Sequence, residues 1–302
     1  MCKRFSRTRS KQPPSRISPS AASTRFCSSE SLPEFAMFFK RISHRIIDFG
    51  VTLILWIYFL FGYLMILVLF YVPAYLFAED SVAAFQNLKH LHLKCFFGLL
   101  RVLVPRTKFD IPQEVRNIHS AVIVCNHISY LDPILLISIF KRQVTIVKQT
   151  FFKVPIFGWF LKHAGYISSG GGDMLGPALI SHLENIKEHI ASGGVLFVFP
   201  EGTRSRDGRL HPFNKGVFTI ARYCNAPLKL VFISGTNRLY PPGSFLFRTM
   251  EHNEIKLELI GSLEPDYKSN QFSVSALADE TRKRFEERAG IAETAPPIRM
   301  QR

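Results

Sequence analysis

The sequence predicts an α/β fold: a mainly parallel sheet flanked by helices, preceded by an N-terminal hydrophobic membrane helix or hairpin. Two observations lead to this expectation. No charged residue occurs from Phe49 to Ala78, and such a run is typical of a membrane segment. After Pro105, short apolar runs alternate with helical segments, which is the pattern of a parallel sheet. At 302 residues the chain can form one or two domains with a sizeable core.

The N-terminal segment, residues 1–36, is rich in Ser and Arg and poor in acidic residues, so it cannot form a core. We expect a disordered basic tail or a targeting segment such as a transit peptide. Met37 leaves a third alternative, because the residues after it would also suit a start before a membrane segment. Residues 1–45 hold a net charge of +8 out of +15. Such charge suits anionic lipid or nucleic acid, and the apolar run that follows favours membrane lipids over nucleic acid.

Residues 37–104 are predicted to form membrane-anchoring helices. As a helix, the uncharged run would be about 45 Å long against a hydrocarbon core of roughly 30 Å, enough to span with tilt or to form a re-entrant element. It is apolar all round, which argues against a buried core helix. Lys40, Arg41 and Arg45 precede it and place its N-terminal flank in the cytosol. A single crossing would put the rest of the chain on the far side, whereas a hairpin would keep it cytosolic; of the two locations we expect the cytosol.

Residues 81–104 mix apolar and basic side chains. We expect one long amphipathic helix or a helix pair, lying on the bilayer face or packed against the folded domain. His90 and His92 are two residues apart and lie on different faces of such a helix, so no metal site is predicted there. The chain has five cysteines without a C-x-x-C pair, so neither a disulfide framework nor a zinc site is expected.

Residues 105–290 are predicted to form the α/β domain, with residues 291–302 as a disordered tail. The apolar runs predict strands at residues 121–125, 143–148, 195–200, 228–234 and 254–261. Helical periodicity predicts helices at residues 132–140, 174–190 and 272–288.

The first candidate for chemistry is the stretch NHISYLD, residues 126–132, which leaves the predicted strand 121–125. In a helix His127 and Asp132 would not share a face. Pro133 biases Asp132 away from helical geometry, and a turn at the carboxyl edge of the sheet would bring the two side chains together. A carboxylate on one imidazole nitrogen leaves the other as a general base. Taken alone, the stretch fits a capping Asp and a surface His better than a catalytic pair.

The second candidate is the stretch FPEGTRS, residues 199–205, which also follows a buried run. Within it Gly202 permits close backbone approach, and Arg204 can fork onto a phosphate. Further along, Lys215 precedes another predicted helix, where anions are favoured. Taken alone, a polar turn carrying a salt bridge would explain these residues.

Together the two stretches resemble the motifs of the glycerolipid acyltransferases, the family of 1-acyl-sn-glycerol-3-phosphate acyltransferases. Asn126, His127 and Asp132 match the motif N-H-x4-D, and residues 199–205 match F-P-E-G-T-R-S at every position. The resemblance covers roughly residues 90–262, and the apolar segment precedes it as the membrane anchor does in many members of the family.

This resemblance implies a membrane-bound O-acyltransferase that converts a lysophosphatidic acid to phosphatidic acid. By the resemblance, His127 deprotonates the acceptor hydroxyl and Asp132 holds the imidazole. The oxygen then attacks the thioester of an acyl-CoA or acyl carrier protein, and neither a cofactor nor a metal is implied. The residues expected around the acceptor and its phosphate are Glu201, Gly202, Thr203, Arg204, Lys148 and Lys215.

One position departs from the family's pattern. Members usually carry an arginine in the sequence G-x-I-x-x-x-R, whereas the run from Gly165 to Gly172 has none. Lys162 or Arg206 could replace that phosphate contact, or the acceptor is another lysophospholipid, glycerol 3-phosphate or an amino-acid lipid. Two other classes of protein stay open: a membrane-bound thioesterase or hydrolase that activates water with the same His/Asp pair, and a non-catalytic lipid-binding protein.

Overall fold

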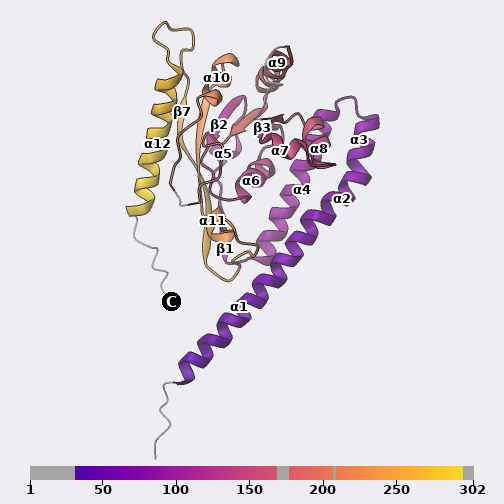
Figure 1. Cartoon of the computed structure of the whole chain (residues 1–302), viewed down its shortest axis with the longest axis vertical. Helices are drawn as coiled ribbons and strands as arrows, with labels where there is room; N and C mark the ends of the chain where they lie inside the picture. Colours follow the sequence, from indigo (N-terminus) through magenta and orange to yellow (C-terminus); the bar gives the residue numbers. More distant parts are fainter. Residues whose placement is uncertain (1–30, 169–176, 207–208, 295–302) are drawn as a thin grey trace, which may run out of the picture. The chain divides into compact units, whose positions relative to one another are not determined.

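A computed structural model describes residues 31–168, 177–206 and 209–294 (Figure 1). The predicted tail at residues 1–30 and the last eight residues, 295–302, lie outside the described residues. The chain up to Ile42 forms one unit, and the chain from Ser43 onward forms another. Helix α1 begins at Ser31, so the boundary predicted at residue 36 falls inside a helix.

The sheet has seven strands in the order β1-β7-β6-β2-β5-β3-β4. All neighbouring strands are parallel except β6 and β7, which are antiparallel. The predicted α/β fold with a mainly parallel sheet is therefore confirmed. The strands are β1 (Thr107–Asp110), β2 (Ala121–Cys125), β3 (Gln143–Val147), β4 (Ile167–Ser168), β5 (Val195–Val198), β6 (Leu228–Ser234) and β7 (Asn253–Leu263).

Helices cover both faces of this sheet, so its central strands are buried on both sides. All five residues of β2 are buried, as expected for a strand of a parallel sheet. Val122 and Val124 face one apolar core, whereas Ile123 and Cys125 face the other. The first core includes residues of α8 (Phe157–His163), α9 (Pro177–Ala191), α10 (Gly216–Tyr223) and α12 (Val274–Thr294), and the second includes residues of α4 (Ser81–Leu103), α5 (Gln113–Arg116) and α6 (Leu131–Ile139).

The predicted elements match the observed ones in kind and differ at their ends. The predicted strand 195–200 ends at Val198, since Pro200 has no N–H to give to a ladder. Helix α12 reaches Thr294, so the predicted tail from residue 291 begins inside it. Six short elements of the described chain were not expected, because they contain too few residues to show a period: β1, β4, α5, α7 (Gln149–Phe152), α8 and α11 (Thr236–Leu239).

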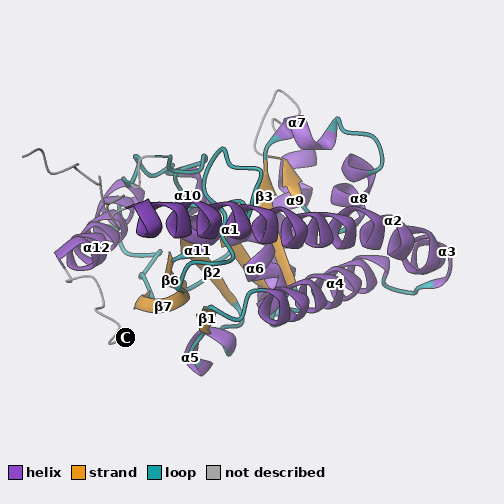
Figure 2. Cartoon of the chain, turned by 90° about the horizontal axis from the view of Figure 1, so that it is seen from below, coloured by secondary structure: helices purple, strands orange, loops and turns teal. Residues whose placement is uncertain are grey.

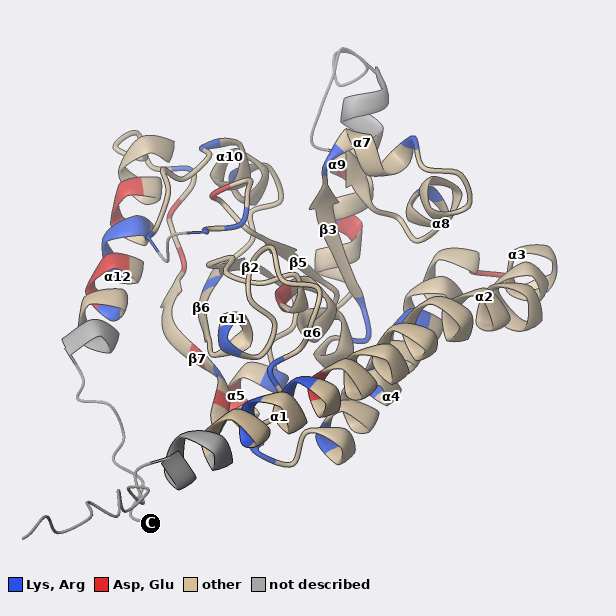
Figure 3. Ribbon diagram, turned by 60° about the horizontal axis from the view of Figure 1, so that its bottom comes forward, with Lys and Arg blue, Asp and Glu red and all other residues tan. Residues whose placement is uncertain are grey.

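Nearly all of the long uncharged run lies within one apolar helical stretch, Met37–Phe77, which is long enough to cross a membrane. It comprises α1 (Ser31–Ile57), α2 (Tyr63–Ile66) and α3 (Val72–Phe77), joined by the π-helical turns η1 (Tyr58–Gly62) and η2 (Leu67–Tyr71). Most of its large apolar side chains are exposed. Figure 3 shows almost no charge along α2 and α3, whereas α12 carries both signs. The segment is a candidate membrane anchor.

Helix α4 turns the anchor into a helical hairpin. It begins after Asp80, whose carboxylate caps it by accepting from Ala83 N at 2.9 Å, and it returns beside α1 and α2 (Figure 2). The ring of Tyr58 stacks on His92, with 5.1 Å between the ring centroids. The opposite face of α4 packs on α6. Of the predicted alternatives, residues 81–103 thus form a single helix that packs against the domain.

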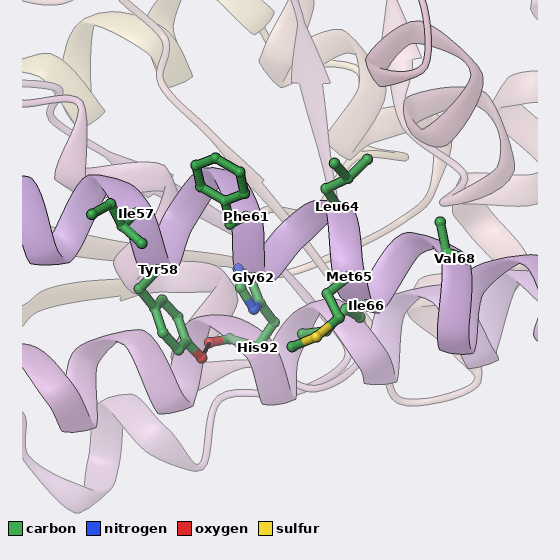
Figure 4. Close-up of a pocket in the computed structure, with 9 residues that line it drawn as sticks. All are labelled: Ile57, Tyr58, Phe61, Gly62, Leu64, Met65, Ile66, Val68 and His92. Carbon is green, nitrogen blue, oxygen red and sulfur yellow. Dashed lines mark hydrogen bonds between the residues drawn. The ribbon is translucent and has the colours of Figure 1, made fainter.

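A shallow apolar hollow of about 530 Å³ lies on this hairpin (Figure 4). It is formed by Gly62 and its neighbours on the long helix and by His92 of α4. A Cβ at Gly62 would lie 3.3 Å from His92 Cε1, so the glycine lets the imidazole approach the helix. The hollow belongs to the apolar surface of the hairpin, away from the polar loops that follow the strands.

At Gly235, between β6 and α11, the backbone passes close to the backbone of β7. We expect no side chain to fit at this position. Its φ is +82°, and a Cβ there would lie 1.9 Å from Glu254 O. Gly243 has nearly the same φ, +79°, but open space around it. Gly243→Ala should cost about 1 kcal/mol of unfolding free energy for the positive φ, and Gly235→Ala at least about 3 kcal/mol because overpacking adds to it.

Denaturant titration of both variants in detergent would measure this difference. Equal losses at the two glycines would show that the chain has room beside Gly235, contrary to the structure.

Candidate functional site

The candidate site lies where three parallel strands end. Strands β5, β2 and β6 are neighbours in the sheet, with Val124 opposite Val198 and Cys125 opposite Val231. Their carboxyl ends therefore lie at one edge, the usual place for sites in open α/β sheets. The loops that leave this edge carry both stretches that the sequence singled out.

Asn126 joins the end of β2 to β6. Its Nδ2 donates to Ile233 O at 2.8 Å, and its Oδ1 accepts from Ile233 N at 2.7 Å. The side chain thus makes the two bonds that a further strand residue would make, while the backbone is free to turn. This amide fixes where the following histidine leaves the sheet.

Asp132 is completely buried, and hydrogen-bond donors surround its carboxylate. Oδ2 accepts from Ile128 N and Ser129 N, both at 2.7 Å, and from His127 Nδ1 at 2.9 Å. Oδ1 accepts from Thr236 Oγ1 at 2.6 Å. A buried carboxylate is stable only with such partners, so Asp132 holds the whole turn together.

The structure corrects the expected backbone of Asp132. Pro133 was expected to keep this residue out of a helix, yet Asp132 lies in the first turn of α6. A proline is tolerated in a first turn, where its missing N–H has no intrahelical partner. Asp132 can therefore be helical while its side chain turns back to the loop before the helix.

His127 is brought to Asp132, as expected. Because a carboxylate can only accept, Nδ1 carries the proton and Nε2 is left as the basic nitrogen. The ring lies against Phe199, with 4.3 Å between the centroids and 24° between the planes. The side chain is 16% exposed, so the pair combines a buried carboxylate with a partly accessible imidazole.

Glu201 ties the two loops together. Its Oε1 accepts from His127 N at 3.2 Å and its Oε2 from His211 N at 3.0 Å. Ser205 N donates to His127 O at 2.8 Å, which adds a second link between the loops. Burial raises the pKa of Glu201 above its ordinary value, although both amides oppose the shift. These contacts give Glu201 a positioning role, and its expected contact with a phosphate stays a prediction.

Arg204 lies next to this link with unused donors. Its guanidinium carbon is 3.8 Å from the ring centroid of Tyr130, which is itself exposed. Nε and Nη1 are buried and have no hydrogen-bond partner in the part of the chain that the structure describes. Both donors therefore lack a protein acceptor, which an acceptor-rich ligand such as a phosphate would supply.

The remaining predicted site residues lie in different parts of the domain. Gly202 and Thr203 are exposed in the loop after β5. Gly202 has φ +66° and open space where a Cβ would lie, so its backbone angle, and not crowding, favours glycine. Lys148 is exposed just after β3, and Lys215 Nζ donates to Ser275 Oγ at 2.8 Å on α12. No described contact brings these two lysines to His127.

Residues 106–234 match the family model for acyltransferases. The match covers less than half of the chain, and residues 106–234 are called the matched domain below. The matched domain includes both loops at the sheet edge, with Asn126, His127, Asp132 and the stretch from Phe199 to Ser205.

Named relatives of the chain include 1-acyl-sn-glycerol-3-phosphate acyltransferases. A chloroplastic 1-acyl-sn-glycerol-3-phosphate acyltransferase of Brassica napus is 33% identical over 189 residues, which is 61% of this chain and 52% of the relative. Another chloroplastic one, from Arabidopsis thaliana, is 37% identical over 124 residues, or 41% of this chain and 34% of the relative. The chain thus spans about half the length, or less, of these relatives.

The fold has a counterpart among solved structures. The 1-acyl-sn-glycerophosphate acyltransferase of Thermotoga maritima aligns with a TM-score of 0.58 at 19% identity, covering 85% of this chain and all of that one. At this identity the likeness concerns the fold alone.

Sequence reasoning missed several residues that shape the site. Thr236 is the first residue of α11, just after β6, and lies 104 residues after the Asp132 it contacts; nothing in the local sequence marks it. Ser129 and Tyr130 lie inside the first stretch but received no role. The ring of Phe199, which lies within the second stretch, packs on the imidazole of His127. An aromatic residue at this position could have indicated such a contact.

Loss of the Glu201 carboxylate should make both loops at the sheet edge more mobile. Glu201→Ala leaves the amides of His127 and His211 without an acceptor, so hydrogen exchange at both should speed up. The free energy of unfolding should fall by about 2 kcal/mol. Glu280→Ala on α12, which removes an exposed carboxylate bonded to Arg284, is the matched control. Equal exchange rates in Glu201→Ala and the wild type would contradict the link.

Proposed function

We propose that the chain is a membrane-bound O-acyltransferase that moves an acyl chain from acyl-CoA or acyl carrier protein to the hydroxyl of 1-acylglycerol-3-phosphate, giving phosphatidic acid. The observation that carries the proposal is the His127–Asp132 pair, 2.9 Å between Nδ1 and Oδ2, at the sheet edge beside Arg204. The names of the relatives support the substrate class.

In this reaction His127 acts as the general base. Its Nε2 takes the proton of the acceptor hydroxyl while the oxygen attacks the thioester carbonyl. The new C–O bond forms as the C–S bond breaks, and the imidazolium returns the proton to the leaving thiolate. Asp132 stabilises the imidazolium and fixes the tautomer, as the carboxylate does in a serine hydrolase triad. The substrate hydroxyl takes the place of the serine.

Arg204 is the proposed phosphate ligand. Its Nε and Nη1 have no acceptor among the described residues, and a guanidinium can bind phosphate oxygens through its N–H donors. Tyr130 lies against the guanidinium, so the fork is partly ordered before the acceptor binds. Gly202 and Thr203, exposed beside it, leave room for the headgroup, and Lys148 stays a candidate helper at the same sheet edge.

The apolar hairpin is the proposed membrane anchor. Both substrates carry long acyl chains, so an enzyme held at the bilayer meets them where they are concentrated. Because α4 returns the chain beside the anchor, a re-entrant arrangement with the domain on the cytosolic side fits the basic flank before Phe49. The basic body of the chain would favour the anionic acceptor and lipid.

The proposal predicts that thiol release depends on the acceptor. Purified protein with acyl-CoA should form phosphatidic acid from lysophosphatidic acid, read by mass spectrometry, and release little free CoA without it. His127→Ala should lower turnover at least about a hundredfold, the typical contribution of a general base. His119→Ala, at an exposed histidine, is the control.

A His127→Ala enzyme with more than a tenth of the wild-type rate would remove the general-base role. Rapid release of CoA and fatty acid without acceptor would instead make the protein a hydrolase. A panel of lysolipids and glycerol 3-phosphate in the same assay identifies the acceptor.

Arg204→Ala should act mainly on acceptor binding. Loss of a charged hydrogen-bonding contact should raise the acceptor KM about tenfold or more, with little change in the thioester KM. The control is Arg222→Ala, since Arg222 also lies over an aromatic ring, that of Phe272, but on α10. An unchanged acceptor KM in Arg204→Ala would take this residue out of phosphate recognition.

A further inference from the structure

Three side chains on one face of α1 hold a loop of the domain. Asp48, Thr52 and Trp56 are spaced by four residues, so they lie on the same side of the helix. All three contact residues 240–249, here called the clamp loop, which connects α11 to β7. These contacts lie within the unit that begins at Ser43.

The contacts are specific and largely polar. Asp48 Oδ1 accepts from Thr249 N at 2.8 Å and from Thr249 Oγ1 at 2.5 Å. Thr52, completely buried, accepts from Phe247 N at 2.9 Å through Oγ1. Trp56 stacks on Phe245, with 6.0 Å between the centroids and 3° between the ring planes.

The inner side of the clamp loop touches the candidate site. Tyr240 stacks on Phe247, with 4.6 Å between the centroids. Its carbonyl accepts from Ser129 Oγ at 2.9 Å, and Ser129 N is one of the donors to Asp132. The rings of Tyr240 and Tyr130 are 6.5 Å apart, and Tyr130 supports the guanidinium of Arg204.

An anchor that only binds lipid would not need these polar groups. A carboxylate beside a long apolar run is costly unless it is paired, and here it accepts two bonds from one loop residue. The loop amides at 247 and 249 in turn need acceptors, which the helix supplies. The polar groups of the helix and the amides of the clamp loop therefore satisfy each other's hydrogen bonds.

We propose that α1 positions residues of the active site as well as anchoring the chain in the membrane. Asp48 and Thr52 are the positioning residues. They act through the clamp loop on Ser129 and Tyr130, and so on the placement of Arg204 for the acceptor phosphate. This inference rests on the proposed function. A shift of about 1 Å in a positioning contact can cost up to a hundredfold in rate, so remote residues of this kind have measurable effects.

The test compares two aspartates that both accept from a backbone amide. Asp48→Ala should lower kcat/KM for lysophosphatidic acid about tenfold, mainly by raising the acceptor KM, with an unchanged thioester KM. Asp48→Asn keeps Oδ1 as an acceptor and should restore most of the loss. Asp80→Ala is the matched control, because it removes the cap of α4 at the far end of the hairpin and should leave both KM values near wild type.

Hydrogen exchange supplies a readout that needs no activity. In Asp48→Ala and in Thr52→Val, the amides of Thr249 and Phe247 respectively should exchange faster, whereas Asp80→Ala should leave both unchanged. Thr52→Val keeps the volume of the side chain and covers the case in which Asp48→Ala does not fold.

The outcomes separate the two proposals. Wild-type protein that makes no phosphatidic acid defeats the proposed function, while the exchange data still decide whether the helix holds the loop. An active enzyme in which Asp48→Ala matches the wild type, or loses no more than Asp80→Ala, overturns the support role. A loss confined to kcat with unchanged acceptor KM overturns the route through Arg204.

Discussion

The buried carboxylate of Asp132 is the contact on which the site depends. It gathers two backbone amides, an imidazole and a hydroxyl from two strand ends, and each donor relieves the cost of burying the charge. The same bonds set the orientation of His127. The constraint is reciprocal, because the buried charge also helps to fix the positions of these donors.

Around this centre, each loop is fixed by a group from another part of the chain. Asn126 ties the first loop to β6, and Glu201 ties it to the second loop. Both of these side chains bond to backbone groups, whereas Arg204 in the second loop has Nε and Nη1 without a hydrogen-bond partner among the described residues. The arrangement separates the residues that hold the site from those offered to a substrate.

The apolar helix and the candidate site are connected through the clamp loop. Within the unit from Ser43 onward, the apolar helix contacts the domain through polar side chains, and the loop it holds reaches the turn that carries Asp132. The geometry of the site therefore depends on the position of the helix.

The sequence alone determined the α/β class, the apolar anchor and both loops, because periodicity, the absence of charge and a seven-residue motif are local properties. The pairing of His127 with Asp132 could be expected once both followed a strand. Only the tertiary structure decided that Thr236 completes the carboxylate's shell, that Glu201 bonds to backbone amides and that Lys215 reaches Ser275. Residues brought together from distant strand ends leave no trace in the local sequence, since their contact depends on the strand order of the sheet.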